Sequence, residues 1–204
     1  DSCRIVGNSA AGDTGGAMVT DASMVNCVVA GNSAVNGGGL WLMSDVEILN
    51  CTVADNTASS DGSGVAIGDS GTPASGIVVK NTIVRENLGG DEFAIVGGTL
   101  TVTYSDIAGG YAGTGNIDAD PLFADLSTSD FRLLIDSPCI NAGAATGAPA
   151  DDFDGNTRDA QPDMGAFEYP TYSISGAVTG DVSTGVTIAI VRGTFNDTAV
   201  TTGT

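Results

Sequence analysis

The sequence contains no histidine and few basic residues. Its 204 residues include 25 acidic and 6 basic side chains, which gives a formal net charge of −19. Histidine is the commonest general base and metal ligand, so catalysis would depend on carboxylates, Arg, Tyr or Lys80. A strongly acidic chain is repelled by nucleic acid and by anionic membrane surfaces. We therefore expect neither a nucleic-acid partner nor membrane insertion.

Long apolar runs are also missing. None approaches the ~20 residues of a membrane span, and no N-terminal signal peptide is visible. The chain opens within its own pattern at Asp1, so we expect a processed product or a piece of a longer protein. Abundant Val, Ile and Thr, with 30 Gly and 6 Pro, are typical of short strands joined by tight turns rather than of disorder. The acidity and the single lysine favour an extracellular or cell-surface location.

A repeat of about 24 residues runs through the first half of the chain. Cys3, Cys27 and Cys51 are evenly spaced, a fourth copy begins at Thr82, and a weaker fifth begins at Ser105. Two further segments of alternating apolar residues precede the repeated position, one of them led by glycine. A single coil of three such strands cannot bury its apolar face, whereas coils stacked at ~4.8 Å form a continuous core. The sequence therefore predicts an all-β fold, a parallel β-helix.

Equivalent residues of stacked coils lie above one another, so we expect columns of identical side chains. The members are Cys3, Cys27 and Cys51; Asn26, Asn50 and Asn81; and Asn8, Asn32, Asn56 and Asn87. Stacked Asn side chains form amide ladders, and Asn tolerates the left-handed backbone of sharp corners. Cysteines in neighbouring coils are close enough for a disulfide, but three positions leave one unpaired. We favour buried free thiols, and expect the same of Cys139.

The second half contains five further motifs. They are Gly115–Phe123, Asp130–Leu134, Ser137–Gly143, Asp152–Arg158 and Asp163–Tyr169. With the repeats, they resemble secreted bacterial right-handed parallel β-helix proteins that end in a C-terminal cap of the choice-of-anchor Q type. The resemblance covers residues 1–169. It implies a right-handed solenoid of about three short strands per coil and a secreted or cell-surface location, and it implies no single activity.

We expect three parts, with coils over residues 1–115, the C-terminal cap over 116–169 and a small antiparallel β tail over 170–204. The tail resembles the start of an immunoglobulin-like or carboxypeptidase-regulatory-like module, but it is too short for a complete sandwich. Either the module is incomplete, or its strands pair with a neighbouring subunit. The first coil also has an unpaired strand edge, which faces outward unless another segment covers it. These features suggest the hypothesis that chains associate head to tail into a filament or matrix fibre, the alternative being that the missing parts lie outside this sequence.

One segment of the cap resembles a metal site. Asp152, Asp154 and Asn156 place oxygen atoms at alternate positions around a glycine, as in the first half of a calcium loop. The distal Glu of such a loop is missing. Calcium is therefore a candidate cofactor, and the alternative is an Asx-type turn.

Two surface features could contact partners. The parity of its strand directs Trp41 outward between inward Leu40 and Leu42, where it could contact carbohydrate or protein. Asn50 and Asn196 both lie in the Asn-x-Thr glycosylation pattern. Because Asn50 is expected inside the coil, Asn196 is the glycosylation candidate.

Charged residues cluster in one coil without matching a catalytic motif. These residues, expected to be exposed, are Lys80, Arg85, Glu86, Asp91 and Glu92. We therefore expect no catalytic site and predict a non-catalytic extracellular structural or surface protein. The alternative is a carbohydrate-binding or polysaccharide-cleaving, lyase-like β-helix, whose partner would be a polysaccharide.

Overall fold

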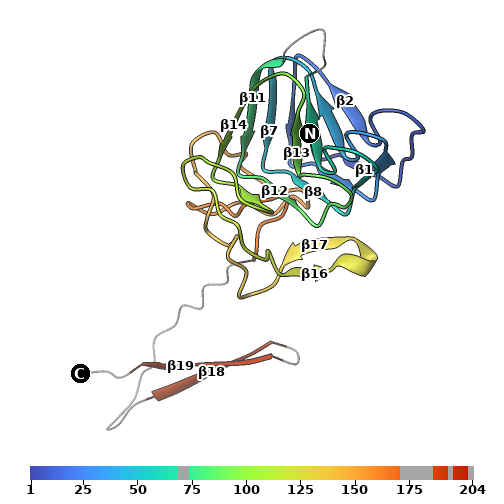
Figure 1. Ribbon diagram of the computed structural model, residues 1–204. Helices are drawn as coiled ribbons and strands as arrows, with labels where there is room; N and C mark the ends of the chain where they lie inside the picture. The colour runs from blue at the N-terminus through green and yellow to red at the C-terminus, as the bar shows by residue number, and fades with distance from the viewer. Residues whose placement is uncertain (69–73, 171–185, 193–194, 202–204) are drawn as a thin grey trace. The chain divides into compact units, whose positions relative to one another are not determined.

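A computed structural model describes residues 1–68, 74–170, 186–192 and 195–201. The chain divides into two units, Asp1–Pro170 and Thr171–Thr204. The first unit is a parallel β-solenoid (Figure 1), so the predicted all-β fold is confirmed. The described residues contain no α-helix, and accordingly no helix that could cross a membrane.

Three parallel sheets form the walls of the solenoid. The first contains β1 (Arg4–Val6), β4 (Val28–Ala30), β8 (Thr52–Ala54), β12 (Ile83–Arg85) and β15 (Asp106–Ile107). The second contains β2 (Ala17–Val19), β6 (Leu40–Leu42), β10 (Val65–Ile67) and β13 (Phe93–Ile95). The third contains β3 (Ala22–Val25), β7 (Val46–Leu49), β11 (Ala74–Lys80) and β14 (Gly98–Thr103). A short pair, β5 (Ser33–Ala34) and β9 (Thr57–Ala58), lies at one corner. Strand order follows coil order in every sheet, as the repeat predicts.

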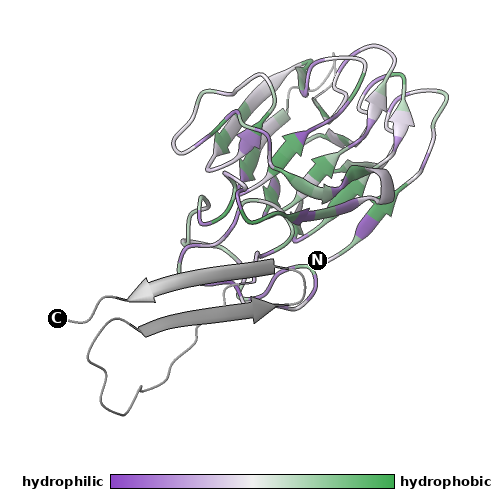
Figure 2. Ribbon diagram, turned by 90° about the horizontal axis from the view of Figure 1, so that it is seen from below, coloured by the Kyte–Doolittle hydropathy of each residue, from purple (hydrophilic) through white to green (hydrophobic). Residues whose placement is uncertain are grey.

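The inward side chains of the three sheets form one apolar core. Leu40 and Leu42 are fully buried and Ile48 nearly so, and the apolar strands of the solenoid stand out in Figure 2. The inward residues of β6, Leu40 and Leu42, alternate with half-buried Trp41, and stacking places Val, Ile and Leu on one another. Residues 108–117 close one end of this core. Tyr111 packs edge-on against Phe93, with ring centroids 5.5 Å apart.

The column Asn8, Asn32, Asn56 and Asn87 is a continuous hydrogen-bonded ladder. The Oδ1 atom of Asn56 accepts from both the backbone N–H and the Nδ2 of Asn32, at 3.1 and 2.9 Å. Asn32 and Asn87 accept in the same way from the coil before them. Glycine faces the ladder, since a Cβ on Gly39 would lie 2.9 Å from Nδ2 of Asn56 and 2.6 Å from a carbonyl oxygen. Asn8, at the outer end, is exposed.

The cysteine column forms a second ladder, of side chains that accept from backbone N–H groups. The Cys27 N–H donates to Cys51 Sγ at 3.3 Å, and the Cys51 N–H donates to Thr82 Oγ1 at 3.2 Å. Ser105 continues the column. The four cysteines are free thiols, three of them buried, while Cys3 lies exposed in the first coil. The expectation of a buried thiol is therefore wrong for Cys3, because no described coil covers it.

The column Asn26, Asn50 and Asn81 has a different role from the predicted ladder. All three have positive φ, between 48° and 51°, as expected at sharp corners. Only Asn81 bonds to its neighbour in the column, Asn50, at 3.2 Å. The other bonds run to the C-terminal segment, for example from Asn50 Nδ2 to the Asp163 carbonyl at 3.1 Å. The left-handed backbone at these corners turns the three amides outward. There they hold residues 144–166.

The segment over residues 116–169 lies mainly along one wall of the solenoid. It contains β16 (Phe123–Asp125), a 3-10 turn η1 (Leu126–Thr128) and β17 (Asp130–Leu133). Phe131 and Phe167 pack on the outer side of Val28 and Ala54, so β4 and β8 are buried on both faces. The predicted cap is therefore chiefly a side cover, while residues 108–117 close the end.

The second unit shows an antiparallel pair, β18 (Val186–Arg192) and β19 (Phe195–Thr201). This pair confirms the small antiparallel sheet expected at the C-terminal end. The first strand expected in the tail falls within residues 171–185, outside the described residues. A two-stranded hairpin alone is marginally stable in water.

Removing a buried amide of the Asn ladder should destabilise the solenoid strongly. The variant Asn56→Ala leaves the Asn32 N–H without its acceptor and removes one donor each from Asn87 Oδ1 and from the carbonyls of Val29 and Ala54. We expect a loss of about 3 kcal/mol in the free energy of unfolding, measured by urea denaturation, because each unsatisfied buried group costs ~1–3 kcal/mol. The matched control Asn8→Ala, in the exposed coil, should cost less than about 1 kcal/mol. Equal losses in both variants would contradict the ladder's role.

Candidate functional site

The outer face of the second sheet carries a groove beside Trp41. Trp41 lies in β6, in register with Met18 of β2 and Ala66 of β10, and Ala66 is in register with Ala94 of β13. Outward side chains therefore form one column across four coils. Trp41 is half-buried between fully buried Leu40 and Leu42, as the strand parity predicts.

The indole of Trp41 is held in place on two sides. Its Nε1 donates to the Gly68 carbonyl at 2.9 Å. A loop passes beneath the ring at Gly37, where an added Cβ would lie 3.1 Å from Cε3 of Trp41 and 3.3 Å from Cβ of Ala66. Gly37 also has a φ of 61°, so both its backbone and its surroundings exclude a side chain. The ring position is thus built into the fold.

A second column, on the loops that precede these strands, forms the polar side of the groove. Asn36 Nδ2 donates to Asp13 Oδ1 at 2.8 Å, and the Asp61 N–H donates to Asn36 Oδ1 at 3.3 Å. The groove has a volume of about 530 Å³, within the ~300–1,000 Å³ of typical ligand pockets. Its far end is lined by Ile95 and Val96 of the fourth coil.

Arg85 of the predicted charged cluster belongs to a partly buried ion-pair network. Its guanidinium lies 3.2 Å from fully buried Asp106 and 2.7 Å from Asp118. Asp106 also accepts from the Ala119 N–H at 3.1 Å and, more weakly, from Cys139 Sγ at 3.5 Å. Burial raises the pKa of Asp106 to about 6, against the lowering effects of the Ala119 N–H and of Arg85. This network fastens the C-terminal segment to the solenoid, so the expectation that Arg85 is an exposed side chain is wrong.

The other members of the charged cluster do not converge on one point. Lys80 donates to the Thr146 carbonyl of the side cover, while Glu86 and Asp91 are exposed. Glu92 is half-buried and accepts from Asn87 Nδ2 at 2.7 Å, so it ends the Asn ladder. Burial raises the pKa of Glu92 to about 7.

A small cleft of about 220 Å³ lies at the end of the solenoid, where Asp91 and Glu92 face the loop at Ala108–Tyr111. A carboxyl group with a pKa near neutrality in a cleft is a common feature of general acids. Glu92 is thus the one group of the predicted cluster whose surroundings resemble a catalytic acid in the described part of the chain. The hydrogen bond from Asn87 also gives Glu92 a structural role at the end of the Asn ladder, and this role explains its position equally well.

The calcium candidates Asp152, Asp154 and Asn156 lie together in a tight turn. The Oδ1 atom of Asp152 accepts from the N–H groups of Asp154 and Asn156 at 2.9 and 2.7 Å, and its Oδ2 accepts from the Glu168 N–H at 2.9 Å. Asp154 pairs with Arg132 at 2.7 Å. These contacts match an Asx-type turn. The described residues hold no cluster of three or more Cys, Asp or Glu arranged around a metal position, and calcium binding stays a prediction.

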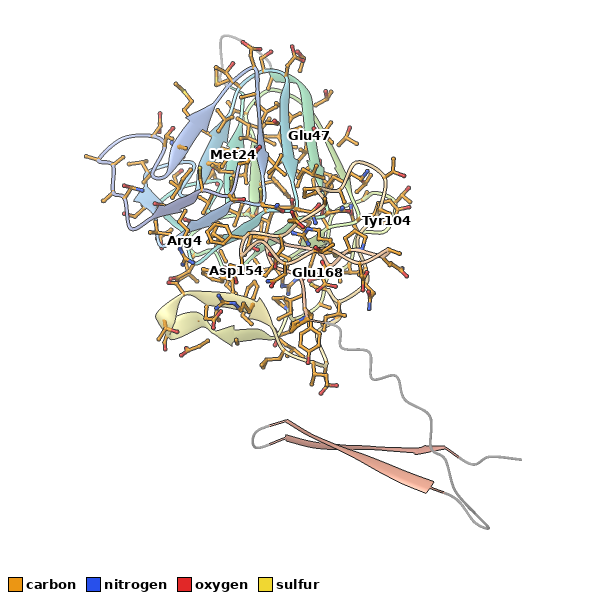
Figure 3. The ribbon with its side chains drawn as sticks, turned by 180° about the vertical axis from the view of Figure 1, so that it is seen from behind. Arg4, Met24, Glu47, Tyr104, Asp154 and Glu168 are labelled. Carbon is orange, nitrogen blue, oxygen red and sulfur yellow. The ribbon has the colours of Figure 1, made fainter. Side chains whose placement is uncertain are left out.

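A buried ion pair in the side cover escaped the sequence analysis. Arg158 and Glu168 lie 2.9 Å apart with side chains 2% and 5% exposed. Arg158 also donates to Asn26 Oδ1 at 3.0 Å, across 132 residues of sequence, and Glu168 accepts from the Asp163 N–H at 3.0 Å. Burial lowers the pKa of Arg158 and raises that of Asp163 to about 6. Figure 3 shows Glu168 and Asp154 in this cover, below the coils.

The two glycosylation patterns have different outcomes. Asn50 is fully buried, in agreement with its exclusion. Asn196 lies in β19, and its side chain lies outside the described residues, so its glycosylation stays a prediction.

The sequence matches no protein-family profile and no curated protein. The function must therefore be argued from the geometry.

The raised carboxyl pKa values predict greater stability in mild acid. Glu92, Asp106 and Asp163 bind protons more tightly in the folded chain than in the unfolded chain. Their contribution is complete below their ordinary pKa values near 4 and is lost as the pH rises through about 6 to 7. We expect the free energy of unfolding to fall between pH 5 and pH 8, measured by urea denaturation.

The variant Glu92→Gln keeps a hydrogen-bond acceptor for Asn87 and removes the proton equilibrium. It should flatten this pH dependence, whereas the control Glu86→Gln, in the same coil but exposed, should leave it unchanged. A stability that rises from pH 5 to pH 8 in the natural chain would show that the buried carboxyl groups do not control it.

Proposed function

We propose that the protein is a non-catalytic extracellular scaffold that presents a rigid β-solenoid on a surface or in a matrix. The observation that carries the proposal is the use of its charged and amide groups for structure. Arg85 joins Asp106 to Asp118, Lys80 holds the side cover, and the Asn ladder spans the coils. A stack of coils whose polar groups are used for internal bonds fits a supporting role.

The extracellular location is the part of this proposal that rests on sequence. Support comes from the net charge of −19 with a single lysine, and from the resemblance to secreted proteins with a choice-of-anchor Q type cap. The motifs of that resemblance include the Asx turn at Asp152 and the Arg158–Glu168 pair, which together fasten the side cover. The tail over residues 170–204 is proposed to begin an immunoglobulin-like module, supported by the pair of β18 and β19.

Head-to-tail association extends the same proposal to a filament. The first coil presents unpaired strand edges at β1 and β2. In these strands Val6 is 45% exposed and Met18 is 65% exposed. A further coil, from a preceding segment or from another copy, would pair with these edges and cover their apolar side chains. The amide Oδ1 of Asn8 stands where each inner Asn accepts from the coil before it.

Glycan cleavage is a second candidate function, and the position of Glu92 favours it. Its carboxyl group has a raised pKa and lies in a cleft beside Asp91, and a pair of carboxyl groups is what glycoside hydrolysis requires. The scaffold proposal explains the same carboxyl group as the end of the Asn ladder.

An activity assay separates these two functions. We expect no release of reducing ends and no unsaturated sugar product when the chain is incubated with pectin, alginate or cellulose at pH 5 to 8. Product release by the natural chain that Glu92→Gln abolishes and Glu86→Gln retains would favour the enzyme and contradict the scaffold.

Multi-angle light scattering tests the filament. We expect the mass to rise with protein concentration, and the substitution Ile5→Lys, at the open end of the apolar core, to reduce this association at least tenfold, because a coil added to β1 would bury the charge. A monodisperse monomer of 20.2 kDa at every concentration would exclude self-association through this coil.

A further inference from the structure

We propose that the groove beside Trp41 binds an extended, uncharged polysaccharide. Trp41 would serve as the stacking platform, and Asp13, Asn36 and Asp61 as the hydrogen-bonding rim. The inference goes beyond the scaffold function, which requires no ligand, and it stands on the geometry of the groove alone.

The indole of Trp41 is held in a fixed position by the fold. The bond from Nε1 to the Gly68 carbonyl and the packing on Gly37 hold the ring before any ligand arrives. A platform that is already ordered loses little conformational entropy on binding. One face of a sugar ring consists largely of C–H groups, and such a face packs on an indole, while the hydroxyl groups remain free for polar contacts.

Small residues follow Trp41 along the outward column. Trp41 is followed by Ala66 and then Ala94. Ala66 is fully buried, because the loop at Gly62 lies against both alanines, and the two alanines line the floor of the groove beside Trp41. It extends across four coils, from Asp13 in the first to Val96 in the fourth, which at ~4.8 Å per coil is about 14 Å. In a chain of sugar rings laid along the column, the advance per ring is comparable to the spacing between two coils. Successive rings would therefore meet equivalent positions of successive coils.

The rim supplies groups that recognise hydroxyls. Asp13 and Asp61 are exposed, and Asn36 between them is half-buried. Asn36 donates to Asp13 and accepts from the Asp61 N–H, so the three residues hold one another in line along the groove. A carboxylate that accepts from a sugar hydroxyl makes a charge-assisted bond, about twice as strong as a neutral one. An aromatic platform facing such a row fits a ligand that has an apolar face and hydroxyl edges.

Charge decides the class of glycan. The two rim carboxylates and the net charge of −19 repel uronate and sulfated chains. Met18, 65% exposed, continues the column in the first coil, and Ile95, 45% exposed, lines the far end of the groove. The groove thus fits an uncharged chain better than an acidic one.

Fluorescence of Trp41 tests the proposal directly, because the chain has a single tryptophan. We expect saturable changes in emission when the complete chain is titrated with cellohexaose or mannohexaose, and none with hexagalacturonate. In calorimetry, Trp41→Ala should weaken binding at least tenfold and Trp41→Phe less, since a ring remains. Asp61→Ala should weaken it at least fivefold. Asp61 is exposed, so this variant tests the rim without disturbing the core.

The control Ile135→Ala alters a side chain that is 64% exposed in the side cover, away from the groove, and it should bind as the natural chain does. Three results would overturn the proposal. They are no saturable binding of either uncharged hexasaccharide, equal binding of hexagalacturonate, and unchanged affinity in both Trp41→Ala and Asp61→Ala.

Discussion

In-register stacking of coils is the constraint on which the rest of the structure depends. When each strand lies directly on its equivalent one repeat later, inward apolar side chains stack on apolar side chains, and an inward polar group must find its partner in a neighbouring coil. Asn56 satisfies this condition by accepting twice from Asn32 and donating to Asn87. Apolar positions satisfy it by packing like on like. A single residue type therefore serves a whole column.

The same stacking determines the outer faces. A wall of stacked strands is covered where its outward residues are small and apolar, as at Ala30 and Ala54, on which Phe131 and Phe167 pack. On the second sheet, half-buried Trp41 lies beside a groove instead. The covered wall fastens residues 116–169 through amides and a buried ion pair, and the open wall forms a groove. The scaffold and the proposed binding face are thus two sides of one solenoid.

The repeat predicts those features that depend on local sequence. The spacing of Cys3, Cys27 and Cys51 indicates the strand partners, and the parity around Trp41 indicates its outward direction; the structure shows both. The repeat does not indicate which residues the outward amides contact. Asn26 meets Arg158 across 132 residues and Asn50 meets Asp163 across 113, and contacts between a repeat and a non-repeated segment leave no periodic signal. The partial burial of Arg85 escaped because Asp106 stands where earlier coils carry Ile83 and Thr52, so the repeat gives no sign of a charged partner there, and because Asp118 lies beyond the repeats.

Amide hydrogen exchange measured by NMR tests the central claim, that the side-chain ladders hold the coils together. The backbone N–H groups of Asn32, Asn56 and Cys51 donate to side chains of the next coil rather than to backbone carbonyls, so their exchange reports the ladders alone. The account predicts that these three exchange only through global unfolding, with the protection of the core strands, while the N–H of exposed Asn8 exchanges faster. Exchange of Asn32, Asn56 and Cys51 as fast as that of exposed loop amides would contradict it.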